Sequence, residues 1–376
     1  MPLDLAACFD SFVAPTRHVL PATADTCYWG YIDRDQPPVL EVSDGDIIEI
    51  EAVTHHAGDA PDLLMDDGIR ALWSGIAEAQ RGPGVHVLTG PIHVRGAEPG
   101  DTLAVRIIDM VPRMPYGSNC AANWGLLYPS FGKERITIYA LNDDSTERSG
   151  HAAGHRHGLD DTQNPGFGAT ASPMFGFDFT ARPLYDLPGV ISEPDPSTRQ
   201  PFSRAVKVPV RPHFGVMGVA PAESGRRSSI PPSVFGGNVD NWRVGPGATM
   251  CYPVFAPGAN LYVGDPHFAQ GDGEICGTAI EASLNAVIQV SVIKGLGNTS
   301  PILETNSHWF THGFSADLHG AMTMAAEQML WLMCEHLGLS RDDAYSLASV
   351  AMDLGVTQVV DATLGCHAAI ARNIVS

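Results

Sequence analysis

The chain has 376 residues, of which 44% are hydrophobic and 17% are charged, and its formal net charge is −20. This composition excludes a disordered chain, and the length predicts one large domain or two closely packed ones. The negative charge argues against nucleic acid and anionic membrane surfaces as partners, because both would repel it.

The N-terminus and the cysteines indicate where the protein works. Residues 1–5 lack a basic segment and a continuous apolar segment, so we expect no signal peptide. No stretch approaches the ~20 apolar residues of a membrane-spanning helix. The seven cysteines are scattered without metal-binding or CxxC spacing. We therefore expect a cytoplasmic protein with reduced thiols.

Strand patterns dominate the first hundred residues. Residues 39–42 and 47–53 are predicted strands on either side of the turn Ser43-Asp44-Gly45-Asp46. In the second strand apolar and acidic residues alternate, which predicts one buried and one wet face. A turn at residues 98–101 precedes another predicted strand at 102–108. Further strand candidates are 135–141, 205–210 and 286–293.

Residues 110–200 are less regular and rich in Gly, Pro, Asn and aromatic residues. Long loops in a compact protein are usually functional or disordered, and the aromatics argue against disorder. We interpret them as pocket walls or a subunit contact. The aromatics are Tyr116, Trp124, Tyr128, Phe167, Phe175, Phe177 and Phe179.

Two helices are predicted near the end of the chain. Apolar residues recur at helical spacing from Leu318 to Leu332, and Gly338 follows as a stop. Ser340 is the expected N-cap of a second helix, which runs through Leu354 to Gly355. A strand is expected at residues 356–360.

The densest polar signal lies between residues 236 and 274. In an extended segment Asp265 and His267 share one face, because side chains alternate along a strand. Together with Asp240 they form a set of ligands suited to Zn²⁺ or a similar divalent ion, and Glu274 could act as general base toward a water activated by the metal. The alternative is ordinary loop chemistry, since Asp272-Gly273 also fits a simple turn.

Several ordered motifs resemble the acetamidase/formamidase family. The central ones are Gly237-Asn238-Val239-Asp240-Asn241, Val263-Gly264-Asp265-Pro266-His267 and Gln270-Gly271-Asp272-Gly273-Glu274. Residues 86–91 with 96–101, 214–221, 276–281, and 356–361 with His367 agree in the same order, so the resemblance covers about residues 20 to 370.

The resemblance implies hydrolysis of the carbon–nitrogen bond of a small linear amide to a carboxylate and ammonia. It also implies a β-rich α+β fold, a homodimer or higher homo-oligomer, and a divalent metal. Within that fold we expect residues 1–200 to form sandwich-like sheets with long aromatic loops. Residues 201–376 would form an α+β part with the acidic/His loop and a helical hairpin, and the two parts would share one active site.

The family's central motif falls on Asp240, Asp265, His267, Asp272 and Glu274. We assign the metal to Asp240, Asp265 and His267, with zinc first and calcium or magnesium as alternatives, and proton transfer to Glu274.

Further residues complete the predicted site. His86 is assigned to catalysis, with ligand, substrate donor and turn cap all open as its role. Asn123 and Trp124 are assigned to the acyl pocket, and Asn238 and Asp272 to substrate binding. For Trp124 the alternative is an ordinary aromatic core anchor.

Two histidine clusters depart from the common pattern of the family. His55, His56 and Asp59 directly follow a predicted strand, where site residues often lie. The histidines of residues 151–157 stand among glycines and fit exposed loop residues better. If these clusters shape the pocket, a substrate other than acetamide or formamide becomes an alternative.

Rival functions remain. A cysteine nucleophile would be Cys276, which follows Glu274 closely but is more simply a small buried residue. A serine nucleophile at Ser228-Ser229 fits poorly beside its arginines and prolines, and the chain has three lysines to assist one: Lys133, Lys207 and Lys294. Outside enzymes, a small-ligand-binding β protein is the alternative.

Overall fold

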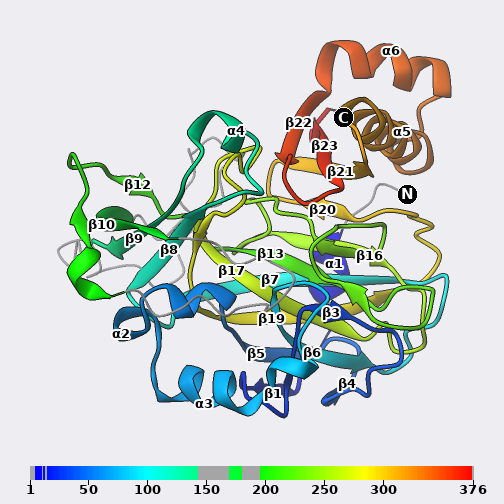
Figure 1. Ribbon diagram of the computed structural model, residues 1–376. Helices are drawn as coiled ribbons and strands as arrows, with labels where there is room; N and C mark the ends of the chain where they lie inside the picture. The colour runs from blue at the N-terminus through cyan, green and yellow to red at the C-terminus, as the bar shows by residue number, and fades with distance from the viewer. Residues whose placement is uncertain (1–4, 11, 13–14, 143–168, 180–194, 375–376) are drawn as a thin grey trace.

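Two large β-sheets stacked face to face form the body of the protein (Figure 1). The computed structural model describes all residues except 1–4, 11, 13–14, 143–168, 180–194 and 375–376. The predicted histidine cluster at 151–157 therefore lies outside the described residues. The strand-rich α+β fold predicted from the sequence is confirmed.

The first sheet has nine strands in the order β1-β5-β19-β7-β16-β20-β21-β23-β22. Neighbouring strands are antiparallel except β1 and β5, which are parallel. In chain order the strands are β1 Arg17–Leu20, β5 Ile47–Ala52, β7 Thr102–Pro112, β16 Thr249–Pro253, β19 Leu284–Ile293, β20 Ile302–Glu304, β21 His308–Ser315, β22 Asp353–Gln358 and β23 Leu364–Ala371.

The second sheet has twelve strands, and its central path is β11-β10-β9-β8-β18-β17-β13-β15. β6 joins this path at β17, β2 and β4 pair with β6, and β12 pairs with β10. The strands are β2 Cys27–Trp29, β4 Leu40–Val42, β6 Val87–Val94, β8 Tyr116–Ala121, β9 Glu134–Leu141, β10 Thr170–Phe179, β11 Gln200–Pro201, β12 Val208–Pro209, β13 His213–Gly218, β15 Gly236–Asn238, β17 Leu261–Ala269 and β18 Ile280–Glu281. A small separate pair consists of β3 Tyr31–Ile32 and β14 Arg227–Ser228.

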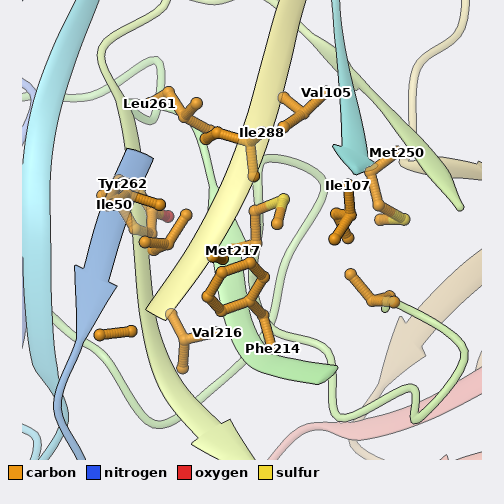
Figure 2. Close-up of a cluster of buried hydrophobic side chains, with 14 of the residues drawn as sticks. Ile50, Val105, Ile107, Phe214, Val216, Met217, Met250, Leu261, Tyr262 and Ile288 are labelled. Atoms are coloured by element: carbon orange, nitrogen blue, oxygen red, sulfur yellow. The ribbon is translucent and has the colours of Figure 1, made fainter. Parts of the chain in front are cut away.

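The main hydrophobic core fills the space between the two sheets (Figure 2). Ile50, Ile107 and Ile288 come from the nine-stranded sheet and meet Phe214 and Met217 of the other sheet. All five are almost fully buried, as the alternation of apolar residues along sandwich strands requires. This core holds β13 and β17 rigidly, and the candidate site is built on these two strands.

Helices cover the margins of the sheets (Figure 1). α5 and α6 pack together as the predicted hairpin, and α5 lies against β21 and β23 in a second core. α2 and α3 form a third core with strands of the twelve-stranded sheet. The helices are α1 Leu5–Asp10, α2 Pro61–Leu64, α3 Asp67–Gly75, α4 Tyr128–Phe131, α5 Leu318–Leu337 and α6 Arg341–Ala351, with short 3₁₀ turns at His55–Asp59, Glu78–Gln80 and Pro196–Thr198.

The caps of the hairpin follow the sequence signals, but the end of its second helix does not. Gly338 adopts a left-handed φ of 72° after α5, and the Ser340 side chain accepts a hydrogen bond from the Asp343 amide at the start of α6. The prediction that the second helix reaches Leu354 is wrong. α6 ends at Ala351, and Leu354 pairs with Ala368 in β22, because the ladder with β23 satisfies its backbone.

The predicted strands vary in how closely they match. In β5 Ile48, Ile50 and Ala52 are buried and Glu49 is exposed, as the alternation indicates. The candidate at 205–210 shortens to β12, Val208–Pro209, which pairs only at the margin of β10. Strands from both halves of the chain pair within each large sheet, and the division near residue 200 stays a prediction.

Among the described residues no helix is long and apolar enough to cross a membrane.

Candidate active site

A small polar cavity lies where β17, β18 and several loops converge. Its volume is about 50 Å³, room for roughly three to five water-sized groups. Five carboxyl groups and three imidazoles line it: Asp240, Asp265, Glu274, Glu281, Asp361, His55, His56 and His86. Among the described residues no lysine or arginine does. The rest of the lining is mostly apolar or amide: Val85, Trp124, Ile230, Asn238, Gly277, Thr278 and Val360.

Three acidic residues of the cavity have unusual backbone conformations. Asp240, Asp265 and Glu274 have φ values of 50°, 49° and 44°, in the left-handed region that side chains other than glycine rarely adopt. Such strain persists only where the surrounding structure enforces it, and it concentrates at functional sites. The fold therefore aims these three carboxyl groups at the cavity.

The strands leave no space behind these side chains. Gly215 of β13 faces β17, and a Cβ at this position would lie 2.5 Å from Asp265 Oδ2, 2.6 Å from His267 Cε1 and 2.7 Å from Asp240 Oδ1. These separations are shorter than atoms tolerate. Glycine at 215 therefore allows the three side chains to converge.

His267 is the centre of a buried hydrogen-bond network. Its Nε2 lies 3.1 Å from Asp265 Oδ2 and 3.2 Å from Glu281 Oε2, and its Nδ1 lies 3.1 Å from His213 Nε2. Burial lowers the pKa of His213 to about 3, so its neutral ring can accept a hydrogen bond from His267 Nδ1–H. This contact directs Nε2 of His267 at the carboxylates.

The charges of His267 and Asp265 support each other. Burial by itself would lower the pKa of His267, but Glu281 and Asp265 outweigh it and raise that pKa well above its ordinary value. Burial would likewise raise the pKa of Asp265, but His267 and His86 hold it well below the usual range. Asp265 is therefore ionised, and the position it faces favours a cation.

His55 and His86 approach the same carboxylate from the opposite half of the chain. His55 Nδ1 lies 3.7 Å from Asp265 Oδ1, and His86 Nε2 lies 3.7 Å from Asp265 Oδ2. Burial lowers the pKa of both imidazoles, and neighbouring histidines lower that of His55 further. Both rings are therefore neutral at pH 7, the form that binds metals.

The remaining carboxyl groups repel one another. Burial raises the pKa of Asp240 well above its ordinary value, and the nearby Glu274 and Asp361 add to the effect. Burial and Asp361 raise the pKa of Glu274 in the same way. Burial also raises the pKa of Asp361, to about 7, despite a hydrogen bond that it shares with Asp240. A cation bound by these carboxyl groups would displace their protons into solvent.

His56 carries a positive charge in the wall of the cavity. Its Nδ1 lies 3.0 Å from Asp59 Oδ2, and the Ser118 hydroxyl donates to the same carboxylate oxygen. Burial lowers the pKa of His56, but Asp59 outweighs burial and raises it to about 9. Asp59 itself stands behind His56 and does not line the cavity.

The cavity fits a divalent cation. His55 Nδ1 and Asp265 Oδ1 are buried with no hydrogen-bond partner among the described residues, and the Asp240 oxygens have none besides the Asp361 carboxyl. Unpaired buried oxygens and nitrogens of this kind are costly unless a cation binds them. Three groups of side chains have ligand atoms within 4.8 Å of one another: His55, His86 and Asp265; Asp240, His267 and Glu274; Asp265, His267 and Glu281.

The structure brings most of the predicted site residues together. Asp240, Asp265, Glu274 and His86 line the cavity, and His267 lies directly behind Asp265. Trp124 and Asn238 form part of the wall, and the Asn238 amide donates a hydrogen bond to Asp361 Oδ2 over 3.0 Å.

Two predicted substrate-binding residues lie elsewhere. Asn123 is exposed and does not line the cavity, although it precedes Trp124. Asp272 is also exposed and accepts hydrogen bonds from Trp242 Nε1 at 2.8 Å and Arg243 Nη1 at 3.2 Å. It stands on the outer side of the loop that carries Glu274.

The alternative nucleophiles are poorly placed. Lys133 and Lys294 pair with Asp178 and Asp101, Lys207 is exposed, and none of the three lines the cavity. Ser229 is fully buried and contacts His86 Nδ1 at 2.9 Å from behind, so it orients the imidazole. Cys276 accepts a hydrogen bond from the Asn119 amide and lies outside the lining, although Gly277 and Thr278 belong to it.

Sequence reasoning did not assign Glu281 or Asp361 to the site, and it left His55 and His56 open. Glu281 is an acid inside an apolar strand segment, Ala279-Ile280-Glu281-Ala282, and such a buried position is a usable signal for a functional carboxylate. Asp361 has a weaker signal, since it follows a strand as many turn residues do.

Comparisons with known proteins agree with the resemblance seen in the motifs. The model of the Acetamidase/Formamidase family matches residues 29–374. An acetamidase from Mycolicibacterium smegmatis is 36% identical over 234 residues, which are 56% of this chain and 54% of that protein, so the match spans about half of the relative's length. A formamidase from Methylophilus methylotrophus is 29% identical over 318 residues, 75% of each chain.

Solved structures share the fold. The crystal structure of a predicted acetamidase/formamidase from Thermoanaerobacter tengcongensis superposes with a TM-score of 0.70 at 23% identity, covering 96% of this chain and 97% of that one. An acetamidase from Bacillus halodurans gives a TM-score of 0.69 at 24% identity, with 94% and 97% covered. With the family model matching almost the whole chain, this protein belongs to the acetamidase/formamidase family.

Proposed function

We propose that this protein hydrolyses the carbon–nitrogen bond of a small linear amide, releasing a carboxylate and ammonia. The observation that carries the proposal is the buried cavity of carboxylates and imidazoles, with no lysine and no cysteine or serine among the described residues that line it, in a chain of this family. Such a set of groups is suited to directing water at a carbonyl carbon.

A divalent cation, zinc in the first instance, would be held by Asp240, Asp265 and His267. Their ligand atoms are one imidazole nitrogen and carboxylate oxygens, a set that Zn²⁺ accepts and that Ca²⁺ or Mg²⁺ can share. When bound, the cation would polarise the amide carbonyl and lower the pKa of water beside it.

Glu274 moves the proton in this proposal. Its carboxyl group lines the cavity, and burial raises its pKa, so it takes up and holds a proton more readily than an ordinary glutamate. It takes a proton from the water whose oxygen adds to the carbonyl carbon. It returns that proton to the nitrogen as the carbon–nitrogen bond breaks, and ammonia leaves.

The walls of the cavity limit the substrate. Trp124, Val85, Ile230 and Val360 supply apolar surface for a short acyl group, and the volume of about 50 Å³ favours a small amide. The side-chain amide of Asn238 is placed to form a hydrogen bond with the polar amide group of the substrate. His86 Nε2 faces the same space, and we assign this imidazole of the cavity wall a role in the reaction.

We also propose a homo-oligomer in a reducing cytoplasm. All seven cysteines are free thiols, which suits that compartment. Around α6 and the edge strand β22 the side chains of Tyr345, Val350 and Leu354 are exposed, and a second copy of the chain would cover them.

Ammonia release from formamide, acetamide, propionamide, butyramide, urea and a simple carbamate tests the function. We expect release from the smallest amides, loss after treatment with a chelator, and recovery with Zn²⁺ or another divalent ion. Release that a chelator leaves unchanged would favour Cys276, and Cys276→Ser would then abolish it. No release from any compound would favour a ligand-binding protein.

A further inference from the structure

We propose that the cavity holds two divalent cations that share Asp265, with the second cation bound by His55, His86 and Asp265. The proposal rests on the proposed function only for the first cation, at Asp240, Asp265 and His267. The two imidazoles of the second site follow β5 or precede β6, and they lie far in sequence from Asp265 and the acidic loop.

The distances suit a shared ion. The atoms of His55, His86 and Asp265 lie within 4.8 Å of one another, and each imidazole nitrogen is 3.7 Å from an oxygen of Asp265. Two ligands bound to one Zn²⁺ at about 2.0–2.2 Å and a tetrahedral angle lie about 3.4 Å apart. Small side-chain shifts would bring all three atoms to bonding distance.

The imidazoles are oriented for binding. The Ser229 hydroxyl lies 2.9 Å from His86 Nδ1 and is fully buried, so Nε2 of His86 points into the cavity. Metal-binding histidines are held by such a contact at the other ring nitrogen. His55 Nδ1 and Asp265 Oδ1 are buried without a hydrogen-bond partner among the described residues, and both face this position.

Asp265 can serve both sites because its neighbours divide between them. His55 and His86 approach it from the loops around β5 and β6, whereas His267 Nε2 approaches Oδ2 at 3.1 Å and also faces Glu281. Two-metal hydrolytic sites hold their ions about 3.5–4 Å apart, a separation that one carboxylate bridges.

The charge of the cavity also favours two divalent cations. Five carboxyl groups line it, with no lysine or arginine from the described part of the chain, so in their ionised forms they carry a formal charge of −5. One divalent ion would leave −3 in a buried space, and two would leave −1.

The two sites differ in the ions they select. Two imidazole nitrogens and one carboxylate make the second site suited to Zn²⁺ and similar transition metals. The first site has one imidazole among carboxylates and also accepts harder ions such as Mn²⁺ or Ca²⁺.

Metal content tests the proposal on the full-length protein. Chelated protein is equilibrated with Zn²⁺, freed of excess metal and measured by inductively coupled plasma mass spectrometry. We expect two zinc ions per chain in the wild type, one in His55→Ala, one in Asp240→Asn, and fewer than one in Asp265→Ala. His319→Ala, an exposed histidine of α5, is the matched control and keeps two.

Anomalous diffraction at the zinc edge on wild-type crystals provides the second readout, with two peaks expected in the cavity. One ion per wild-type chain, or two ions retained in His55→Ala, would overturn the proposal. If His55→Ala fails to fold by circular dichroism, His86→Ala and the anomalous map decide in its place.

The same samples are assayed for ammonia release. Two ions without amide hydrolysis would refute the proposed function and leave the second site standing. Amide hydrolysis by a protein that binds a single ion would support the proposed function and refute the second site.

Discussion

At the scale of single residues, the convergence of the site depends on a residue that has no side chain. Gly215 packs against Asp240, Asp265 and His267, and a Cβ there would lie within 2.7 Å of an atom of each. The left-handed φ of Asp240, Asp265 and Glu274 adds backbone strain, which the surrounding structure must also compensate. Precise placement of the carboxylates thus comes from backbone geometry as much as from the ligands themselves.

We expect Gly215→Ala to displace these side chains and to lower metal affinity and kcat/KM by about 10- to 100-fold, the size of effect seen when groups that support a metal site are disturbed. Zinc titration and steady-state kinetics measure both. Gly271→Ala is the matched control, because a Cβ at Gly271 meets no atom within 4 Å. Equal behaviour of the two variants would refute this account of Gly215.

Glu274→Gln should remove turnover while the protein stays folded. The amide cannot accept the proton from water, so we expect kcat to fall by about 10²- to 10⁴-fold. The melting temperature should hold or rise, because the change also relieves repulsion from Asp361 and Asp240. Glu327→Gln, an exposed glutamate of α5, is the control. Retained activity would exclude Glu274 from the mechanism.

At the scale of secondary-structure elements, the pair β21 and β23 makes the fold sensitive to acid. His312 and His367 are directly opposite in this ladder, and both are buried. Burial lowers the pKa of His312 to about 4 and that of His367 to about 2, and Arg243 contributes to both shifts. In the unfolded chain both would titrate near 6.5.

The lowered pKa values of His312 and His367 determine how stability depends on pH. Below pH 6.5 the unfolded chain takes up protons that the folded chain refuses. Stability is therefore full above pH 6.5 and is lost as the pH falls, toward about 4 for His312 and about 2 for His367. Each histidine contributes a slope of up to about 1.4 kcal/mol per pH unit.

The His367→Leu variant should lose less stability as the pH falls. The slope of its free energy of unfolding against pH should be smaller by the contribution of about one proton. Neither ring nitrogen of His367 has a hydrogen-bond partner among the described residues, so leucine should cost little at pH 7. Urea unfolding of chelated protein at pH 7, 5.5 and 4.5 measures the free energy of unfolding, with His319→Leu as the exposed control. Identical slopes for wild type and His367→Leu would contradict the prediction.

At the scale of the whole molecule, each large sheet takes strands from both halves of the chain. β5 and β7, from the first half, enclose β19 from the second, and β6 pairs with β17. The candidate site spans the same division, since His55 and His86 meet Asp265. Cooperativity between the halves is expected from this pairing.

We therefore expect residues 1–200 and residues 201–376, expressed separately, to remain unfolded, because each would expose unpaired strand edges and half of a core. Circular dichroism and thermal unfolding of each fragment, beside the full-length chain, measure this. A fragment that unfolds cooperatively by itself would establish the division predicted near residue 200.

Local signals in the sequence were sufficient for much of the architecture. The alternation of Ile48, Glu49 and Ile50 predicted a strand with one buried face, and the structure has it. The apolar spacing of α5 with Gly338 as its stop was equally clear. These features depend on neighbours within one or two turns or along one strand, which is why they can be read directly.

The sequence by itself determined the family motifs, the strand-rich α+β class and the acidic/His loop with Asp240, Asp265 and Glu274. Only the tertiary structure decided that Glu281 and Asp361 join this cavity, that Asp272 turns outward to Arg243, and that His55 and His86 meet Asp265. Those contacts join strands and loops that are distant along the chain. Their positions depend on sheet order and core packing, which no local pattern encodes.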